Sequence, residues 1–346
     1  MAHTKGGIRL AFQDNEYQIV YASDDGYAEA LGVSLTSLFE NNQDAKSIQV
    51  TILDSGISSK NHTRIEEVCQ KYNRSLPRWV KAVDIEKHLS IRVNLDRGSL
   101  SQYARIFLNE VYDSDIERVL YLDCDTLIVS SIANLWNMSL QGNIIAALKD
   151  AFSEMYRRNI DLQKEDVMFN SGVMLVDLNQ WRKQCVEKYV LDFILSKNGK
   201  VQQGDQGALN AVLSRKTKVL GPQYNLVSIF FDLTYAQIKK YRKPVDFYTK
   251  NEIENAKKNP VIIHFTSSFY NRRPWFQNSD HVKASQWLDY RNKGPWCSEL
   301  VSRDTRSGMK KIVYDVYHHI PRGLSLTIAG ILQAYVRPMK YRVTGR

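Results

Sequence analysis

The chain is 346 residues long, and its 43% hydrophobic and 11% aromatic residues can bury the core of one large domain or two modest ones. This composition excludes a disordered chain, a collagen helix and a coiled coil. The formal net charge is +10, but residues 301–346 hold nine Lys or Arg and two Asp, which is +7 and leaves only +3 for residues 1–300. Nucleic-acid binding is therefore not expected of the body of the chain.

Short apolar runs alternate with helical patterns along the body. Strands are predicted over residues 17–23, 48–53, 79–83, 118–122, 144–148, 168–178 and 261–265. Helices are predicted over residues 27–40, 58–72, 100–111, 181–195 and 205–213. The alternation favours a parallel sheet covered by helices on both faces. Ligands bind beyond the carboxyl ends of the strands in such sheets, so the acidic residues that follow the first and fourth strands are expected at one edge.

Cysteine usage and targeting signals concern the cellular compartment. The four cysteines, at positions 69, 124, 185 and 297, show no short Cys-Cys spacing, so neither a zinc ribbon nor a redox pair is indicated. This usage suits a reducing compartment. We recognise no signal peptide and no apolar run of membrane-spanning length, and we therefore expect a cytoplasmic protein.

Two acidic residues directly follow the strand predicted over 118–122, in the sequence Asp123-Cys124-Asp125. Because the strand stops there and the chain bends, both carboxylates can turn toward one ion, and oxygen ligands of this kind suit Mg²⁺ or Mn²⁺. His264, near the end of another predicted strand, is a third candidate ligand. The alternatives are a solvated turn or helix cap for the acidic pair, and a hydrogen-bonded core histidine for His264.

Six segments, taken in order, carry a family resemblance. They are residues 21–27 (YASDDGY), 103–105 (YAR), 119–125 (VLYLDCD), 169–173 (FNSGV), 204–206 (GDQ) and His264. Together they resemble glycosyltransferase family 8, which comprises retaining enzymes and includes bacterial lipopolysaccharide galactosyl- and glucosyltransferases. The resemblance implies a GT-A type α/β fold with a mostly parallel central sheet flanked by helices. We expect a catalytic domain over residues 17–280, a frayed segment before it (1–16) and a basic amphipathic, helical C-terminal region after it (281–346).

The resemblance also implies the chemistry of the site. It implies a UDP-glucose or UDP-galactose donor, Mn²⁺ (or Mg²⁺) and retention of the anomeric configuration. Asp123, Asp125 and His264 correspond to the metal ligands. The residues implied in binding the donor are Ala22, Asp24, Asp25, Gly26, Tyr27, Arg105, Asp123, Cys124, Asp125 and Arg273. The residues implied around the transferred sugar, with catalytic roles, are Asp150, Asn170, Asp205 and Gln206.

Several of these residues also have an ordinary structural interpretation. Arg105 could be a solvated helix arginine, Asp150 could cap a helix, and Asp205 with Gln206 could open one. Asn170 could occupy a turn. A further residue of the fourth segment, Gly172, is expected to permit a close backbone approach.

The chain departs from the family pattern at two places. Gly26 stands where the family often has Asn, so a ribose or base contact there would come from the backbone or be missing. After His264 the segment carries three extra residues, with Ser267 in place of a glycine and Arg273 in place of a lysine. A guanidinium keeps the charge and can hold a diphosphate in bidentate fashion.

The function expected from these residues is the retaining transfer of a hexose from a UDP-sugar to a glycan or a lipid-linked saccharide. Attack from the face of the departing group is favoured, because the amide of Gln206 is a weak nucleophile. One alternative is a sugar nucleotidyltransferase, which should show a glycine-rich phosphate loop that residues 24–26 do not form. The other is a non-catalytic protein that binds a nucleotide sugar or a membrane, which should lack the metal carboxylates.

The C-terminal region has a pattern of its own. Met309, Ile312, Val313, Val316, Tyr317 and Ile320 recur at three- and four-residue spacing, which predicts an amphipathic helix that ends at Pro321 and Gly323. Residues 324–336 are apolar-rich but too short to span a bilayer, and Arg337, Lys340, Arg342 and Arg346 follow. An apolar face with a basic flank suits an anionic membrane surface, so we expect a peripheral enzyme on the cytoplasmic face of a bacterial inner membrane. The alternative is a helix packed on the body.

Overall fold

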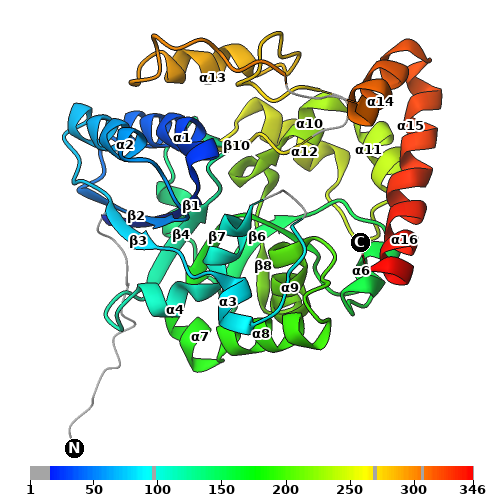
Figure 1. The fold of residues 1–346 in the computed structure, drawn as a ribbon, viewed down its shortest axis with the longest axis horizontal. Helices are drawn as coiled ribbons and strands as arrows, with labels where there is room; N and C mark the ends of the chain where they lie inside the picture. The colour runs from blue at the N-terminus through cyan, green and yellow to red at the C-terminus, as the bar shows by residue number, and fades with distance from the viewer. Residues whose placement is uncertain (1–15, 96–98, 268–270, 305–307, 346) are drawn as a thin grey trace, which may run out of the picture.

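The computed structural model describes residues 16–95, 99–267, 271–304 and 308–345, where helices cover both faces of a central sheet and a long helix runs along one side (Figure 1). The segment 1–15, for which fraying is expected, lies outside this part, as do Arg346 and the side chains of Met309, Lys310 and Val313. The predicted α/β architecture is confirmed.

The central sheet has seven strands in the spatial order β3-β2-β1-β4-β7-β6-β8. They are β1 (Glu16–Ser23), β2 (Ser47–Asp54), β3 (Arg78–Lys81), β4 (Arg118–Leu122), β6 (Ile145–Lys149), β7 (Phe169–Asp177) and β8 (Thr217–Val219). β7 is antiparallel to β4 and β6, and all other neighbours are parallel. β7 therefore begins where β4 and β6 end, with Val173 opposite Leu122 and Phe169 opposite Lys149. The mostly parallel sheet is as expected, whereas an apolar run alone does not reveal that a strand is reversed.

Both faces of the sheet are buried, because alternate residues of β1 enter two different cores. Ile19 and Tyr21 pack with α1 (Ala28–Glu40) and α2 (Ser59–Lys71), while Val20 enters the core on the opposite face. That second core holds α3 (Ile85–Leu89), the 3₁₀ helix η2 (Leu100–Phe107), α4 (Leu108–Val111), α6 (Glu154–Asn159), α7 (Leu178–Lys183), α8 (Val186–Ser196) and α9 (Gly204–Leu213). The remaining helices of the body are α5 (Ala133–Trp136), α10 (Ser228–Asp232), α11 (Tyr235–Arg242), α12 (Lys250–Lys258) and α13 (Ala284–Arg291).

Two predicted helices differ from the structure. The helix expected over 181–195 is divided into α7 and α8, because Cys185 between them has a left-handed backbone with φ of 49°. The helix expected over 100–111 is mostly the 3₁₀ helix η2, with only its last turn α-helical as α4. The η2 segment buries the side chains of Gln102 and Arg105, which later prove to line the site.

A second, three-stranded sheet brings a distant segment to the end of β4. Its strands are β5 (Thr126–Ile128), β10 (Ile262–His264) and β9 (Leu226–Val227), with β10 in the middle. β10 pairs antiparallel with β5 and places His264 opposite Thr126. Because Asp123 and Asp125 directly precede β5, this register puts His264 beside both carboxylates.

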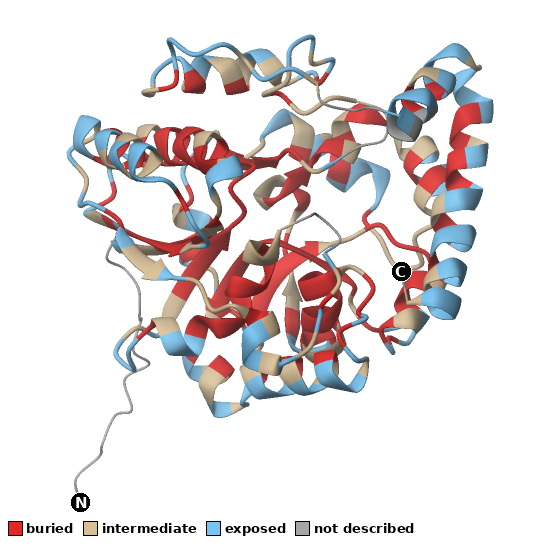
Figure 2. Ribbon diagram, in the orientation of Figure 1, coloured by how far each residue is buried: buried red, intermediate tan, exposed pale blue. Residues whose placement is uncertain are grey.

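The C-terminal region is helical, as expected: after α13, residues 308–344 form two helices separated at Pro321, and the first of them is the amphipathic helix predicted from the spacing. The first is α14 (Gly308–His319), and the second begins as α15 (Arg322–Ile331), passes through a π-helical turn (Leu332–Val336) and ends as α16 (Arg337–Thr344). We call this second helix the C-terminal helix. It lies close against α11, since a Cβ on Gly330 would come within 2.7 Å of the carbonyl oxygen of Lys240. Its inner face is buried and its outer face exposed (Figure 2).

Polar contacts also fix the C-terminal helix. The Ser153 hydroxyl donates to the carbonyl oxygen of Ala334 at 2.8 Å, and the Asn159 amide donates to that of Pro338 at 2.8 Å. A helix packed on the body was the alternative to membrane binding. This packing is observed for the inner face of the C-terminal helix. Within the described residues, we find no helix long and apolar enough to cross a bilayer.

Candidate active site

Asp123, Asp125 and His264 meet at the carboxyl end of β4, and we call them the acidic triad. One ligand atom from each lies within 4.8 Å of the others. The His264 Nε2 is 3.1 Å from Asp125 Oδ1 and 3.6 Å from Asp123 Oδ2. All three side chains are buried, with His264 fully inaccessible to solvent. Two carboxylates shielded from water in this way need a positive partner.

A chain of hydrogen bonds orients the imidazole ring of His264. The backbone N–H of Gly172 donates to Asn170 Oδ1 at 3.1 Å, which therefore also accepts from Asn225 Nδ2 at 3.0 Å. The Asn225 Oδ1 is then an acceptor, and His264 Nδ1 donates a hydrogen bond to it at 2.9 Å. This leaves Nε2 as the ring nitrogen that faces the two carboxylates, and in the tautomer protonated at Nδ1 it offers a lone pair to a metal ion.

This donor set fits a divalent cation. Nε2 is buried beside two carboxylates and has no hydrogen-bond partner among the described residues, and a bound cation would satisfy all three groups. Oxygen and imidazole ligands suit Mn²⁺ and related divalent ions. Gly172 completes the cradle, because a Cβ there would lie 2.2 Å from His264 Cε1 and 2.7 Å from Asp123 Oδ2. The close approach expected at this glycine is confirmed.

The Arg105 side chain is buried and binds a carboxylate of the triad instead of facing solvent. Its Nη2 donates to Asp123 Oδ1 at 2.7 Å, its Nη1 to the carbonyl oxygen of Ser171 at 2.8 Å, and its Nε lies 3.1 Å from Asp205 Oδ2. Burial alone would lower the pKa of Arg105, but its ion pairs with Asp123 and Asp205 raise the pKa overall. The solvated-arginine alternative is therefore wrong, and Arg105 stays charged between the two carboxylates.

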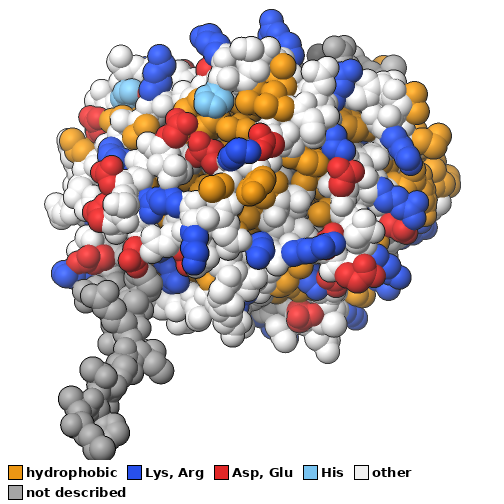
Figure 3. Space-filling view, turned by 90° about the horizontal axis from the view of Figure 1, so that it is seen from below, with side chains coloured by type: hydrophobic (Ala, Val, Ile, Leu, Met, Phe, Trp, Pro, Cys, Tyr) orange, Lys and Arg blue, Asp and Glu red, His pale blue; other side chains and the backbone are white. Residues whose placement is uncertain are grey.

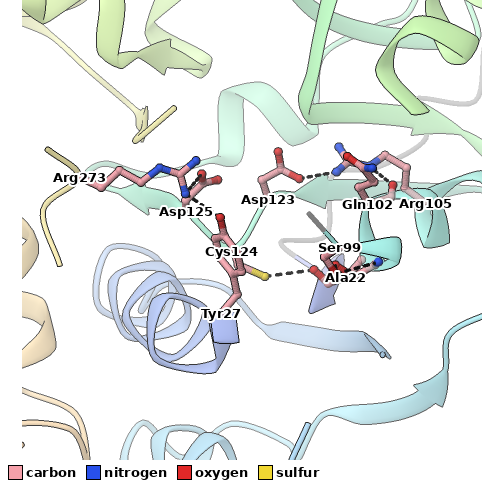
Figure 4. Close-up of a pocket in the computed structure, with 10 residues that line it drawn as sticks. Ala22, Tyr27, Ser99, Gln102, Arg105, Asp123, Cys124, Asp125 and Arg273 are labelled. Atoms are coloured by element: carbon pink, nitrogen blue, oxygen red, sulfur yellow. Dashed lines mark hydrogen bonds and ion pairs between the residues drawn. The ribbon is translucent and has the colours of Figure 1, made fainter. Parts of the chain in front are cut away.

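The first pocket lies in front of the triad (Figure 4). The residues that line it are Ala22, Tyr27, Ser99, Ser101, Gln102, Arg105, Asp123, Cys124, Asp125 and Arg273. Arg273 closes one side: its Nη1 lies 3.4 Å from Asp125 Oδ2 and donates to the Tyr27 hydroxyl at 2.7 Å, while Nη2 donates to Ser267 Oγ at 3.0 Å. Burial raises the pKa of the Cys124 thiol, so it is protonated and acts as wall rather than nucleophile.

The segment 24–26 contributes less to this pocket than the resemblance implies. Asp24 is half-buried, and Asp25 is exposed and turned away, accepting from the backbone N–H of Ser58 and the side-chain amide of Asn61, each at 2.8 Å. These hydrogen bonds lower the pKa of Asp25. Gly26 lines a neighbouring pocket together with Tyr27 and Arg273. Asp25 thus fastens the loop to the start of α2.

A second pocket of about 230 Å³ adjoins the first and shares Gln102 and Arg105 with it. Asp150, Asn170 and Gln206, which we call the amide cluster, line it together with Asp205. Gln206 Nε2 donates to Asp150 Oδ2 at 3.1 Å, and Gln206 Oε1 accepts from the backbone N–H of Ser171 at 3.3 Å. Asn170 Nδ2 donates to Asp150 Oδ2 at 3.3 Å. The structure thus brings together all four residues implied around the sugar.

The sequence interpretation missed several residues of the two pockets. Ser99, Ser101 and Gln102 line the first pocket, and Asn225 orients His264. Phe152, Gln203, Arg242, Gln333 and Arg337 line the second pocket. The Ser-x-Ser pair before a buried helical turn was a weak signal of a cap. Nothing in the local pattern of Asn225, Arg242 or Arg337 indicates proximity to the site.

Comparisons with known proteins agree with this geometry. The family model described as Glycosyl transferase family 8 matches residues 18–279. The chain is 27% identical to general stress protein A of Bacillus subtilis, over 82% of this chain and 96% of that protein. It is 24% identical to lipopolysaccharide 1,2-glucosyltransferase of Escherichia coli, over 92% of this chain and 91% of that protein.

Among solved structures, the fold is similar to that of the galactosyltransferase LgtC in complex with donor and acceptor sugar analogues. The TM-score is 0.66 at 24% identity, and the likeness covers 82% of this chain and 100% of that chain. Identity at this level supports the GT-A type fold. Since the family match extends over well more than half of the chain, the protein is a transferase that belongs to glycosyltransferase family 8.

Proposed function

We propose that the protein is a retaining hexosyltransferase that takes glucose or galactose from a UDP-sugar, with Mn²⁺ or Mg²⁺ in the acidic triad, and transfers it to a glycan or lipid-linked saccharide. The observation that carries the proposal is the junction of two pockets at one sheet edge, the first lined by carboxylates of the triad and the second by the amide cluster. Relatives named lipopolysaccharide 1,2-glucosyltransferase and lipopolysaccharide 1,3-galactosyltransferase support this choice of sugar and acceptor.

The first pocket suits a nucleoside diphosphate. A divalent cation held by the triad supplies positive charge beside a departing diphosphate. Arg273 adds a guanidinium whose present partners include the neutral hydroxyls of Tyr27 and Ser267. These hydrogen bonds can be exchanged for stronger ones to phosphate oxygens as negative charge grows on the leaving group.

The second pocket suits the transferred sugar. Both ends of the Gln206 amide are already hydrogen bonded, to Asp150 and to the backbone of Ser171. An amide held in this way orients sugar hydroxyls better than it attacks the anomeric carbon. We therefore favour attack by the acceptor hydroxyl from the side of the departing diphosphate. The new glycosidic bond forms as the bond to phosphate breaks, and the departing phosphate oxygen takes the hydroxyl proton.

A donor screen tests the proposed activity. Purified protein is incubated with UDP-glucose, UDP-galactose and other UDP-sugars in MnCl₂, without acceptor, and UDP release is measured. We expect slow hydrolysis of one UDP-hexose that EDTA abolishes. Pyrophosphate-dependent formation of UTP would instead identify a sugar nucleotidyltransferase. Mn²⁺-dependent binding of UDP without turnover of any donor or acceptor would identify a non-catalytic protein.

Replacing Gln206 tests the route of attack. We expect Gln206→Ala to retain detectable turnover, lowered about ten- to a hundredfold, because the amide positions the sugar without bonding to it. The donor dissociation constant is measured in parallel by quenching of tryptophan fluorescence. Complete loss of turnover with intact donor binding would favour a covalent intermediate on Gln206.

We further propose that the outer face of the C-terminal helix docks on an anionic membrane. This outer stripe consists of Leu324, Ile328, Ile331, Leu332, Tyr335, Val336, Met339 and Val343, which are 40–81% exposed. The small residues Ser325, Ala329, Gly330 and Ala334 face inward, which reverses the usual arrangement of an amphipathic helix on a soluble domain. Apolar side chains and basic residues gather at this edge of the molecule (Figure 3). Each basic residue near anionic lipid contributes about 1 kcal/mol.

Flotation with liposomes tests the membrane proposal. We expect the protein to float with vesicles containing anionic lipid, less so in high salt, and to sediment with neutral ones. The triple variant Ile328→Ser, Leu332→Ser and Tyr335→Ser should lose flotation. Leu195→Ser, which changes an equally apolar residue that is 44% exposed on α8, is the matched control and should float normally. Flotation of the triple variant at the level of the control would disprove docking by the outer stripe.

A further inference from the structure

The C-terminal helix also lines the second pocket, and we call the part of the lining that it forms with its neighbours Phe152 and Arg242 the wall. Gln333 and Arg337, from this helix, line the pocket together with Phe152 and Arg242. Both residues of the helix lie beyond the segment 18–279 that matches the family. The pocket at the sugar site is therefore completed by a part of the chain that the family match does not cover.

Two guanidinium groups at this wall lack carboxylate partners within the described part of the chain. Arg242 lies over the rings of Phe152 and Tyr241, 5.0 Å from each centroid, and its Nε is buried without a hydrogen-bond partner there. Arg337 is exposed at the start of α16. By contrast, Arg105 and Arg273 are paired with the triad carboxylates. An unpaired guanidinium in a pocket is free to bind an anion in bidentate fashion.

The wall is held in place relative to the sugar site. The Gln333 amide donates to the Tyr156 hydroxyl at 2.9 Å, and Phe152 and Tyr156 pack together with ring centroids 4.8 Å apart. Asn159, at the end of α6, donates to the carbonyl oxygen of Pro338 at 2.8 Å and to Gln202 Oε1 at 2.6 Å. α6 thus connects the C-terminal helix to the loop that carries Gln203 and leads into Gln206. A ligand at the wall would be positioned with respect to the amide cluster.

The residues that line each of the two pockets indicate which part of a ligand would contact Arg242 and Arg337. The diphosphate of a donor belongs beside the acidic triad, in the first pocket, and its sugar belongs beside the amide cluster. Arg242 and Arg337 line the second pocket and do not line the first, which is the pocket that contains the two triad carboxylates. An anion there is separate from the donor diphosphate. Neutral hydroxyls alone would leave the half-buried guanidinium of Arg242 without a charge partner among the described residues, while the exposed Arg337 adds a second positive charge to the same pocket.

We propose that Arg242 and Arg337 form an acceptor subsite for a saccharide that carries an anionic group, either a phosphate ester or a carboxylate. This inference rests on the proposed glycosyl transfer and adds the chemical class of its acceptor. The Phe152 ring supplies an apolar surface for the sugar ring, and Gln333 supplies an amide for its hydroxyls. Because the outer face of the same helix carries the outer stripe, an anionic saccharide on a lipid would reach this subsite from the membrane side.

The experiment compares acceptors that differ by one charge. With the UDP-hexose found in the donor screen, UDP release is measured for pairs of soluble oligosaccharides with and without one phosphate ester or one carboxylate. For the parent we expect the anionic member of a pair to have a KM at least about tenfold lower. Arg242→Gln and Arg337→Gln should each reduce this preference about tenfold through KM, with little change in kcat. Arg242→Lys should restore part of it, since a point charge remains.

The matched control is Arg158→Gln, which removes the same charge from an exposed position on α6 outside both pockets and should keep the preference. Equal KM values for both members of every pair in the parent would overturn the proposal, as would an unchanged preference in both arginine variants. If the variants instead impair hydrolysis of a UDP-hexuronic acid alone, the anion belongs to the donor and the acceptor subsite is disproved.

A direct binding measurement separates this inference from the proposed function. Calorimetric titration with the same saccharide pairs requires no turnover. If no UDP-sugar is hydrolysed, the proposed activity fails, yet tighter binding of the anionic member that Arg242→Gln abolishes would still establish the anion site. Equal binding of both members by parent and variant would disprove it independently of activity.

Discussion

The body of the chain and its C-terminal helix differ in the size of the residues that they bury. In the body, large apolar side chains fill the cores on both faces of the sheet, and the charged groups lie together at the strand ends. In the C-terminal helix, the residues that face the body are mostly small, with Leu326 as a large exception, and eight large apolar residues face outward. The body is therefore held by two large cores, whereas the helix is placed by close backbone contact, hydrogen bonds and a small apolar contact through Leu326 and Ala329. The apolar side chains of the outer stripe remain exposed.

The two regions also treat their arginines differently. The guanidinium of Arg105 is neutralised by Asp123 and Asp205, so its role is to hold carboxylates in place. Arg337 on the C-terminal helix and Arg242 at the end of α11, against which that helix packs, have no carboxylate partners within the described residues. If the proposed function and acceptor subsite hold, the body supplies the metal and sugar chemistry and the C-terminal helix contributes to acceptor recognition. The predictions below test this division, starting with the largest expected effect.

Removing one carboxylate of the acidic triad should have the largest effect on activity. Asp125 lies 3.1 Å from His264 Nε2 and is almost fully buried. We expect Asp125→Ala to lower Mn²⁺-dependent UDP release at least about a thousandfold, because the site loses a charged ligand. Manganese binding, measured by calorimetry, should weaken in parallel. Asp192→Ala removes an exposed carboxylate on α8 and should change neither quantity. Near-normal turnover by Asp125→Ala would disprove the metal assignment.

Adding one methyl group at Gly172 should damage the site almost as much. The new Cβ would overlap His264 Cε1 at 2.2 Å and Asp123 Oδ2 at 2.7 Å, and both side chains would have to move. We expect Gly172→Ala to lower turnover about a hundredfold and the free energy of unfolding by about 1–3 kcal/mol.

The control for this change is Gly323→Ala on the C-terminal helix. Nothing lies within 4 Å of a Cβ built at Gly323, and helix propensity favours alanine by up to about 1 kcal/mol. Thermal unfolding and UDP release are measured for both variants. Equal activity of Gly172→Ala and the parent would show that the triad does not need this close approach.

The sequence alone predicts the features that depend on local patterns and not those that depend on long-range contacts. The β-α-β order predicts the sheet, and the spacing of Asp123 and Asp125 after an apolar run predicts a candidate ion site. The pairing of β10 with β5, which brings His264 to that site, depends on long-range contacts that no local pattern encodes. The reversed direction of β7 and the role of Asn225 are hidden for the same reason.

The orientation of the C-terminal helix is even less predictable from the sequence. The amphipathic pattern was recognised over residues 309–320, whereas residues 324–336 were identified only as apolar-rich, and such a pattern does not tell whether an apolar face turns inward or outward. The orientation is decided by where small residues such as Gly330 and Ala334 allow the helix to approach the body. Arg242 and Arg337 look like ordinary surface arginines until the fold places them at one pocket.

Two neighbouring leucines of the C-terminal helix should respond very differently to truncation. Leu326 is buried at 1% exposure in the core with α11, whereas Leu324 is 53% exposed on the outer stripe. We expect Leu326→Ala to lower the free energy of unfolding by about 2–4 kcal/mol, because it leaves a cavity, and Leu324→Ala to change it by less than about 0.5 kcal/mol. Urea unfolding of both variants measures the difference. Similar values for the two would mean that the helix is not oriented as described.

Stability toward acid should depend on His281, where the body meets the region that follows β10. This histidine is buried and packs against Phe231 and Phe265, with ring centroids 5.8 and 5.0 Å away. Its Nδ1 accepts from the backbone N–H of Lys283 at 3.1 Å, so the ring is neutral. Burial lowers the pKa of His281 from 6.5 to about 4.

Because the folded chain takes up this proton less readily than the unfolded chain, the contribution is fully present above pH 6.5 and is lost as the pH falls toward 4. We expect the parent to lose on the order of 2 kcal/mol more than His281→Asn between pH 7.5 and 4.5, measured by urea unfolding in EDTA. Asparagine keeps an acceptor for Lys283 but does not titrate. The exposed His319→Asn serves as the control and should behave like the parent. An identical loss of stability in His281→Asn and in the parent would assign the acid sensitivity to other groups.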